Sequence, residues 1–394
     1  MRDDSPDATM TRRSHLSSFL AAVVVALAAA GALRGADTPV SGWSYWLIGD
    51  AWREHRVDAV PVGATPGRAR AVLRAIPGNL AVAAGGVSVD GRYLVAARRQ
   101  RRRSDVVLAT ATNEASLTLL QSTTRRFTAP VFARGNESVA VSRIGRGECG
   151  DRQAALVLVD RVSAETTAIR LPATPRHARR NVLDEVVGAS PDGGHVAVSR
   201  VYAGTGCERL LDIAGWSGIL VDVASRRVRE ITSEPLREAK WSPDGTRLAY
   251  TVGTTGGCAL YVARGDGSRR RTVRSTERAW DPRLNCWSRL PFEWTARNQL
   301  LFTAGQALYA FHPDARGPRR LFLSPRPIRA GCAFVEGCPA EVFGVGSHSG
   351  QVLVIAKPGQ RDERWFLVDP VTRSAETIAK PRVRGGRLLA VRLP

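Results

Sequence analysis

The sequence predicts an all-β fold, a seven-bladed β-propeller with six blades as the alternative, preceded by one hydrophobic N-terminal helix. A ten-residue phrase recurs at blade spacing, in residues 189–198 and 241–250 with a weaker copy in residues 87–96. In each copy an Asp-Gly pair separates two runs of alternating apolar and polar residues, which indicates two strands joined by a tight turn. Repeats of 20–50 residues indicate stacked supersecondary units.

The remaining elements follow the same period. We call the first two strands of a blade its inner pair and the last two its outer pair. Besides the three phrases, inner pairs are expected in residues 131–141, 292–302, 345–354 and 382–391. Outer pairs are expected to open at residues 57–60, 106–109, 156–160, 219–223, 260–263, 307–310 and 366–369.

The two ends of the chain each leave half a blade. The outer pair that opens at residues 57–60 has no inner pair before it, and the inner pair at residues 382–391 has no outer pair after it. We therefore expect the chain start and the chain end to share one blade and close the ring. Closure of this kind removes the open strand edges that would otherwise favour aggregation.

The Ser-Pro-Asp-Gly turn, followed by Val-Ala-Val in one copy and Leu-Ala-Tyr in the other, resembles the repeat of TolB-type propellers over about residues 57–394. This motif is specific for architecture, because its Pro and Asp form the turn and its Gly supplies the special backbone angle. The resemblance leaves the function open. Its members include periplasmic interaction proteins and propellers attached to peptidases, and a fold does not determine a function.

The N-terminus predicts export. Residues 16–33 are almost wholly apolar and follow Arg12 and Arg13, as in a signal peptide or a signal-anchor. We therefore divide the chain into a cytoplasmic segment (1–15), the hydrophobic segment (16–33), a linker (34–56) and the propeller (57–394). The protein is expected outside the cytoplasm, either anchored in the membrane or secreted. The linker contains three aromatic residues that are expected to pack on the fold: Trp43, Tyr45 and Trp46. The alternative is that they lie at the membrane interface.

Charge is the most unusual property of the composition. The 394 residues carry 57 Lys and Arg against 36 Asp and Glu, a net charge of +21, and only three of the cations are lysines. Such a surface attracts anionic lipid, acidic polymer and nucleic acid without specificity. The alternative is an amino-acid bias of a GC-rich genome with arginines dispersed over the surface. No specific nucleic-acid partner is predicted.

Propeller topology separates the loops into two ends. Turns within the inner and outer pairs are short and share one end of the blades, the short-turn end. The remaining connections share the opposite, long-loop end, and the longest are residues 99–104, 144–153, 201–216, 275–290 and 324–340. Binding sites are usually built on loops that a rigid scaffold holds in place.

All six cysteines fall at the long-loop end, and an even number in an exported protein predicts disulfides rather than free thiols. Six cysteines allow 15 pairings. Proximity in the sequence favours Cys149–Cys207, Cys258–Cys286 and Cys332–Cys338. No metal site is predicted, because the histidines are scattered and no Cys-x-x-Cys spacing occurs.

The same end supplies the candidate binding residues. Arginine and tryptophan most often dominate binding contacts, and the arginine fork suits carboxylate and phosphate. The candidates are Arg98, Arg99, Arg101, Arg102, Arg103, Trp216, Trp280 and Trp287. The alternative is a solvated arginine-rich loop. Two further tryptophans, Trp241 and Trp294, fall in expected strands and should be core.

No catalytic residue and no cofactor is predicted. The chain lacks a Gly-x-Ser-x-Gly elbow, and residues 346–350 carry histidine at the centre of a similar pattern. The function predicted is non-catalytic binding of a protein partner or ligand in the cell envelope. One alternative is a hydrolase or lyase acting on a glycan or peptide in the central channel. Another is recognition of an anionic polymer or a membrane surface through arginine.

Overall fold

The computed structural model divides the chain into Met1–Pro39 and Val40–Pro394, and every described residue belongs to the second unit. The described ranges are 43–48, 56–61, 70–73, 79–110, 116–145, 154–171, 182–203, 213–254, 257–273, 292–304, 307–323, 341–345, 351–356, 363–378 and 386–392.

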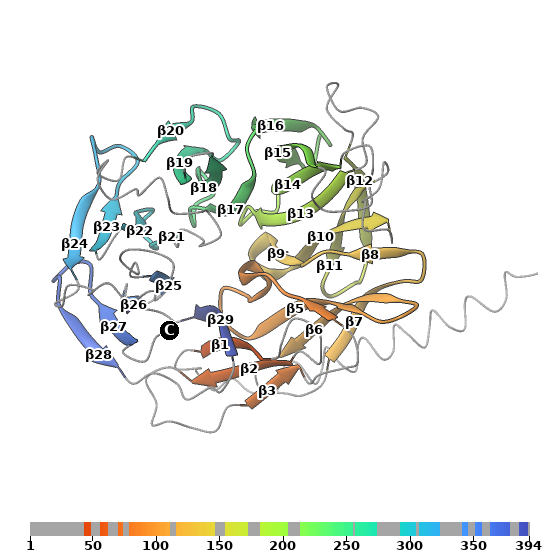
Figure 1. Cartoon of the computed structure of the whole chain (residues 1–394), viewed down its shortest axis with the longest axis horizontal. Coiled ribbons are helices and arrows are strands. Elements are labelled where there is room, and N and C mark those ends of the chain that lie inside the picture. The colour runs from red at the N-terminus through yellow and green to blue at the C-terminus, as the bar shows by residue number, and fades with distance from the viewer. Residues whose placement is uncertain are drawn as a thin grey trace, which may run out of the picture. The chain divides into compact units, whose positions relative to one another are not determined.

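The described residues form seven antiparallel sheets, numbered here along the chain (Figure 1). Sheet 1 consists of β29 (Gly386–Arg392), β1 (Trp43–Ile48), β2 (Arg56–Pro61) and β3 (Arg70–Leu73), in that order. Sheet 2 consists of β4 (Asn79–Ala81), β5 (Tyr93–Arg99), β6 (Ser104–Thr110) and β7 (Ser116–Ser122). In sheet 3, β8 (Arg125–Phe127) and β9 (Val131–Ala133) both pair with β10 (Ser138–Gly145), which is followed by β11 (Ala155–Asp160) and β12 (Thr166–Arg170).

The other four sheets each have four strands in chain order. Sheet 4 consists of β13 (Val182–Ala189), β14 (His195–Ala203), β15 (Ile213–Asp222) and β16 (Val228–Thr232). Sheet 5 consists of β17 (Leu236–Trp241), β18 (Arg247–Thr254), β19 (Gly257–Arg264) and β20 (Arg271–Thr272). Sheet 6 consists of β21 (Phe292–Trp294), β22 (Leu300–Ala304), β23 (Ala307–Phe311) and β24 (Arg319–Leu323), and sheet 7 of β25 (Glu341–Val345), β26 (Val352–Ala356), β27 (Arg364–Val368) and β28 (Ala375–Ile378).

Helical structure is sparse in the described ranges, which contain the short 3₁₀ turns η1 (Ala84–Gly86) and η2 (Arg134–Asn136). No helix among these residues is long and apolar enough to cross a membrane. The hydrophobic segment of residues 16–33 lies outside the described residues, so the export prediction stays a prediction.

The core lies between the sheets. Each pair of successive sheets shares a hydrophobic cluster, and sheet 7 shares one with sheet 1. Middle strands such as β6 are buried along their whole length, because both faces of the sheet are covered. The last strand of a sheet, such as β12, is mostly exposed. Each fully buried Leu, Val or Phe contributes about 1.5–3 kcal/mol of apolar burial. This all-β arrangement is that of a propeller.

The repeated turns are held by their own side chains. In the turns before β14 and β18, the Oγ atoms of Ser190 and Ser242 each donate to an aspartate two residues later, at 2.6 Å. Each serine Oγ also accepts the N–H of the residue that opens the next strand. The glycines between them, Gly193 and Gly245, have φ of 71° and 72°, a left-handed conformation that glycine adopts without strain. The predicted Asp-Gly turns are therefore confirmed.

One boundary of the predicted domains is wrong. The expected linker, residues 34–56, contains β1, which pairs with β29 on one side and β2 on the other. Sheet 1 therefore takes three described strands from the start of the chain and one from its end, where two and two were expected.

Both faces of β1 are covered, which explains why its sequence does not alternate. Tyr45 packs in the cluster shared with sheet 2, and its hydroxyl donates to the carbonyl of Gly91. On the other face, Trp46 stacks on Trp365 of sheet 7 with ring centroids 5.9 Å apart. The prediction that Tyr45 and Trp46 pack on the fold is confirmed, whereas the side chain of Trp43 lies outside the description.

Candidate functional site

The hairpin that joins β5 to β6 lies at the long-loop end and holds five of the predicted binding residues. Arg98 is opposite Asp105, and its Nε and Nη2 donate to Asp105 Oδ2 at 3.0 and 2.5 Å. Asp105 is fully buried, Arg98 is almost so, and Arg103 Nε completes the group at 3.1 Å from the same carboxylate. The prediction that Arg98 binds a ligand is therefore corrected, because its guanidinium belongs to a buried ion pair that fixes the hairpin.

The tip of this hairpin is exposed. The backbone N–H of Gln100 donates to the carbonyl of Arg103 at 2.8 Å, which closes the turn. Arg101 and Arg102 project from it into solvent. These two arginines match the alternative of a solvated loop.

Arg99 lies in a different environment. It is opposite Ser104, whose Oγ accepts the N–H of Phe127 and so brings β8 of sheet 3 beside the hairpin. Burial and the neighbouring Arg126 lower the pKa of Arg99, while Glu185 on β13 acts in the opposite direction. The buried Nε of Arg99 has no hydrogen-bond partner among the described residues. We call Arg99, Arg126 and Glu185 the Arg99 group, which has a net charge of +1.

Trp216 is partly buried on β15, and it contacts an arginine that the sequence analysis missed. The guanidinium of Arg237, on β17 of the next sheet, lies 5.8 Å from the centroid of its ring. This distance suits a cation–π contact. No local pattern indicates the pair, because it forms between strands of different sheets.

Several predicted residues lie outside the description. These are Trp280, Trp287, Cys149, Cys207, Cys286, Cys332 and Cys338. The backbone of Cys258 pairs with Gly253 in β18, but its side chain is also outside the description. The disulfide pairings stay predictions. Trp241 and Trp294 are buried in strands as predicted, and their Nε1 atoms donate to backbone carbonyls.

A charged group also links the first strands of sheets 5 and 6. Lys240 Nζ lies 3.0 Å from Glu238 and 2.8 Å from Glu293, and donates to the carbonyl of Phe292 at 2.7 Å. Burial opposes the charge of Lys240, but the two glutamates outweigh it and raise the pKa. Lys240 is therefore a protonated cross-link between sheets rather than a base. Among the described residues, no three His, Cys, Asp or Glu side chains are grouped to hold a metal ion.

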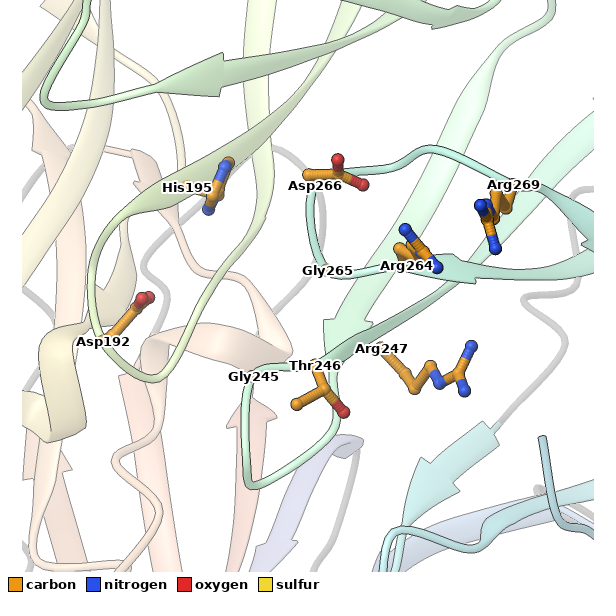
Figure 2. Close-up of a pocket in the computed structure, with 9 residues that line it drawn as sticks. All are labelled: Asp192, His195, Gly245, Thr246, Arg247, Arg264, Gly265, Asp266 and Arg269. Atoms are coloured by element: carbon orange, nitrogen blue, oxygen red, sulfur yellow. The ribbon is translucent and has the colours of Figure 1, made fainter. Parts of the chain in front are cut away.

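A recess of about 520 Å³ opens at the short-turn end, between turns of sheets 4 and 5 (Figure 2). The sequence analysis looked for a site at the opposite end. One sequence signal could have indicated this recess. It is the arginine that follows each Asp-Gly turn of sheet 5. The lining residues are Asp192, His195, Gly245, Thr246, Arg247, Arg264, Gly265, Asp266 and Arg269.

Comparisons with known proteins bear on the fold. No family model matches the chain, and no curated protein matches its sequence. Among solved structures, the S511A mutant of puromycin hydrolase complexed with PGG has a TM-score of 0.53 at 14% identity, over 92% of this chain and 56% of that one. Oligogalacturonate lyase in complex with manganese has a TM-score of 0.50 at 11% identity, over 87% of both chains. TolB from Acinetobacter baumannii has a TM-score of 0.42 at 13% identity, over 94% of this chain and 70% of that one.

The fold is that of a β-propeller. The chain spans about half the length of puromycin hydrolase, and at these identities the likenesses show the fold alone. Two groups of described arginines lie at opposite ends of the sheets, the Arg99 group at the long-loop end and the arginines of the recess at the short-turn end.

Proposed function

We propose that this propeller is a non-catalytic binding protein of the cell envelope, which takes an acidic group of a protein partner at the Arg99 group. In this proposal residues 16–33 direct export, and the seven sheets are the blades of one ring closed by the pairing of β1 with β29. The long loops around the Arg99 group supply the rest of the partner surface.

The pattern of contacts between sheets supports the closed ring. Strands of successive sheets contact one another along the chain, and β25 of sheet 7 contacts β29 of sheet 1. Deleting residues 381–394 should therefore expose an edge of β1 and lower the melting temperature of the whole domain. An unchanged melting temperature would show that these residues do not close the ring.

The observation that carries the binding proposal is the charge of Arg99. Its guanidinium is partly buried beside a second arginine, and its Nε has no partner among the described residues. Burial and Arg126 make this charge costly and Glu185 offsets only part of the cost, so a carboxylate from outside would relieve the rest. Arginine binds carboxylate through two parallel N–H···O bonds, so the same contact would also fix the orientation of the partner.

The ion pair beside Arg99 keeps the site in place. Asp105 holds Arg98 and Arg103 on either side of the hairpin tip, so little backbone freedom remains to be lost when a partner binds. Rigid placement of this kind favours binding, because the conformational entropy of the hairpin is already lost when the protein folds and not when the partner binds.

Crosslinking in cells that express the tagged full-length protein tests the proposal. Mass spectrometry should recover one reproducible envelope protein, and the Arg99→Met and Arg126→Met variants should each lower its recovery roughly tenfold, as expected for a charge-assisted contact. A fluorescent hexaglutamate peptide, titrated at low and high salt, gives the affinity for acidic groups directly.

Arg227→Met is the matched control, because it removes the same charge from an exposed position in the turn between β15 and β16. Equal losses in all three variants would mean that dispersed arginine charge, rather than the Arg99 group, attracts the partner. Recovery of glycan or lipid alone would contradict a protein partner and favour the enzymatic alternative.

Export has a test of its own. Fusing residues 1–60 to a reporter that is active only outside the cytoplasm should give an active fusion, and replacing Arg12 and Arg13 should reduce this activity. An inactive fusion would contradict the location proposed here.

A further inference from the structure

The short turns of neighbouring sheets meet at the short-turn end, and one position governs these junctions. It is the residue two places before β5, β10, β14, β18 and β22, and in all five of these turns it has a left-handed backbone. The residues and their φ angles are Gly91 (67°), Asn136 (77°), Gly193 (71°), Gly245 (72°) and Asn298 (57°).

Where this residue is asparagine, it bridges to the preceding sheet. Asn136 of sheet 3 accepts the N–H of Val89 in sheet 2 at 3.2 Å. Asn298 of sheet 6 donates from Nδ2 to Asp244 of sheet 5 at 2.6 Å. Both junctions are therefore closed by a side chain from the turn itself.

Where this residue is glycine, a side chain of the preceding sheet contacts it in two of three cases. The hydroxyl of Tyr45 reaches the carbonyl of Gly91, and the Cβ of Arg134 lies 2.9 Å from where a Cβ on Gly193 would stand. At Gly245 nothing lies within 4 Å of such a Cβ. The recess between sheets 4 and 5 therefore exists because the junction at Gly245 lacks the side chain that closes the other four.

The aspartates of the recess accept hydrogen bonds from groups within their own turns. Asp192 accepts the hydroxyl of Ser190 and the N–H of Gly194, and Asp266 accepts the N–H of Ser268 at 2.8 Å. These hydrogen bonds lower the pKa of both carboxyl groups, so both are ionised at neutral pH. Because their oxygens already accept hydrogen bonds within the turns, they have little need of a bound cation.

The arginines of the recess make fewer hydrogen bonds than its aspartates do. Arg247 extends to Asp314 of sheet 6 at 3.3 Å. Arg264 and Arg269 are exposed, and neither guanidinium has a hydrogen-bond partner among the described residues, although Arg264 lies near enough to Asp266 to affect its charge. Figure 2 shows Arg264 and Arg269 on the wall formed by the turn after β19, with Asp192 and His195 on the wall formed by sheet 4.

We propose that this recess is a second binding site, for the oxyanion group of a small ligand or of a peptide side chain, held by Arg264 and Arg269. The planar guanidinium presents paired donors that match a carboxylate or a phosphate. A volume of about 520 Å³ admits such a group together with the atoms that carry it. The site lies at the opposite end of the sheets from the Arg99 group and does not depend on the function proposed for it.

Calorimetric titration of the full-length protein tests the site, with inorganic phosphate and triglutamate as separate probes. Arg99→Met serves as the parent for every variant here, so that an acidic probe does not also titrate the Arg99 group. One probe should bind saturably at one site, and the tighter of the two identifies the source of the oxyanion. Arg269→Met should weaken this binding roughly tenfold, because a charge-assisted contact is lost. Gly245→Asn should weaken it similarly, because asparagine tolerates the left-handed backbone and its side chain would enter the recess.

Gly135→Asn is the matched control. Gly135 also has a left-handed backbone, with φ of 56°, and nothing lies within 4 Å of its Cβ position, but it is not in the recess. This variant should bind the probe as its parent does. The proposal is overturned if neither probe saturates, or if Arg269→Met binds as tightly as Gly135→Asn. If Gly245→Asn does not fold, Arg269→Met alone decides whether the recess is the binding site.

Discussion

Sheets 2 and 4 each carry an arginine late in the second strand, and the two arginines have opposite environments. In sheet 4, Arg200 is fully buried, and its Nε and Nη2 each lie 2.6 Å from an oxygen of Asp184. Burial would lower the pKa of Arg200, but the hydrogen bonds and charge of Asp184 outweigh it and raise the pKa. In sheet 2, burial and Arg126 lower the pKa of Arg99, whose Nε has no partner among the described residues.

The difference comes from the residue on the neighbouring strand. On the first strand, Asp184 of β13 is directly opposite Arg200, whereas Asn79 of β4 is opposite Arg99. On the third strand both arginines are opposite a serine, Ser217 and Ser104. An arginine opposite an aspartate becomes part of the core, and one opposite an uncharged asparagine keeps a charge that an external acid can neutralise. The same residue type therefore stabilises one blade and, in our proposal, supplies a binding group to another.

The largest effect is expected from breaking the sheet 4 pair. Asp184→Asn leaves the buried Arg200 without its counter-charge and should lower the free energy of unfolding by about 3–5 kcal/mol in urea titrations. A double variant, Asp184→Leu with Arg200→Met, should regain most of this loss, because it removes both charges. A loss below about 1 kcal/mol for the single variant would show that the pair is not a stabilising contact.

A smaller effect is expected at the sheet 2 pair. Asp105→Asn should lower the free energy of unfolding by about 2–3 kcal/mol, because Arg98 is buried but Arg103 is partly exposed and can turn to water. Thermal unfolding measures the change. Arg103→Met, which leaves Asp105 with Arg98, should cost less than Asp105→Asn, and the reverse order would contradict this assignment.

A smaller effect still is expected at Arg99. Arg99→Met keeps the apolar stem and removes a charge repelled by Arg126, so stability should stay within about 1 kcal/mol of the parent or rise slightly. Urea titration beside Arg98→Met, which breaks the buried pair, gives the comparison. If both variants lose the same stability, Arg99 is a structural residue and the binding proposal loses its basis.

The smallest effect concerns the aspartates of the short turns, which are held by neutral donors. Hydrogen bonds from Ser163 and Val162 lower the pKa of Asp160. A lowered pKa contributes stability above the unfolded value and loses it as the pH falls through the folded value. Asp160→Asn should therefore be about 0.5 kcal/mol less stable than the parent at pH 6 and equal to it near pH 2. A gap that stays constant across this range would show that the carboxylate is not the stabilising group.

The sequence could predict what lies within one turn or one hairpin. Ser190 and Asp192 are two residues apart, so their hydrogen bond appears in the sequence as a motif and recurs wherever the motif does. The predicted strand at residues 57–60 lies within β2 for the same reason. In β1 this reasoning failed, because a strand covered on both faces shows no alternation and its partners lie at both ends of the chain.

The sequence by itself determined the repeated strand-turn-strand units, because each is stabilised by hydrogen bonds between residues close along the chain. The tertiary structure decided the roles of the arginines and the existence of the recess. The bond between Asn298 and Asp244 joins residues 54 positions apart, and the open junction at Gly245 can be recognised only beside the filled ones. Burial and pairing depend on which strand lies opposite, and the packing of successive sheets sets this, rather than the spacing of residues within a motif.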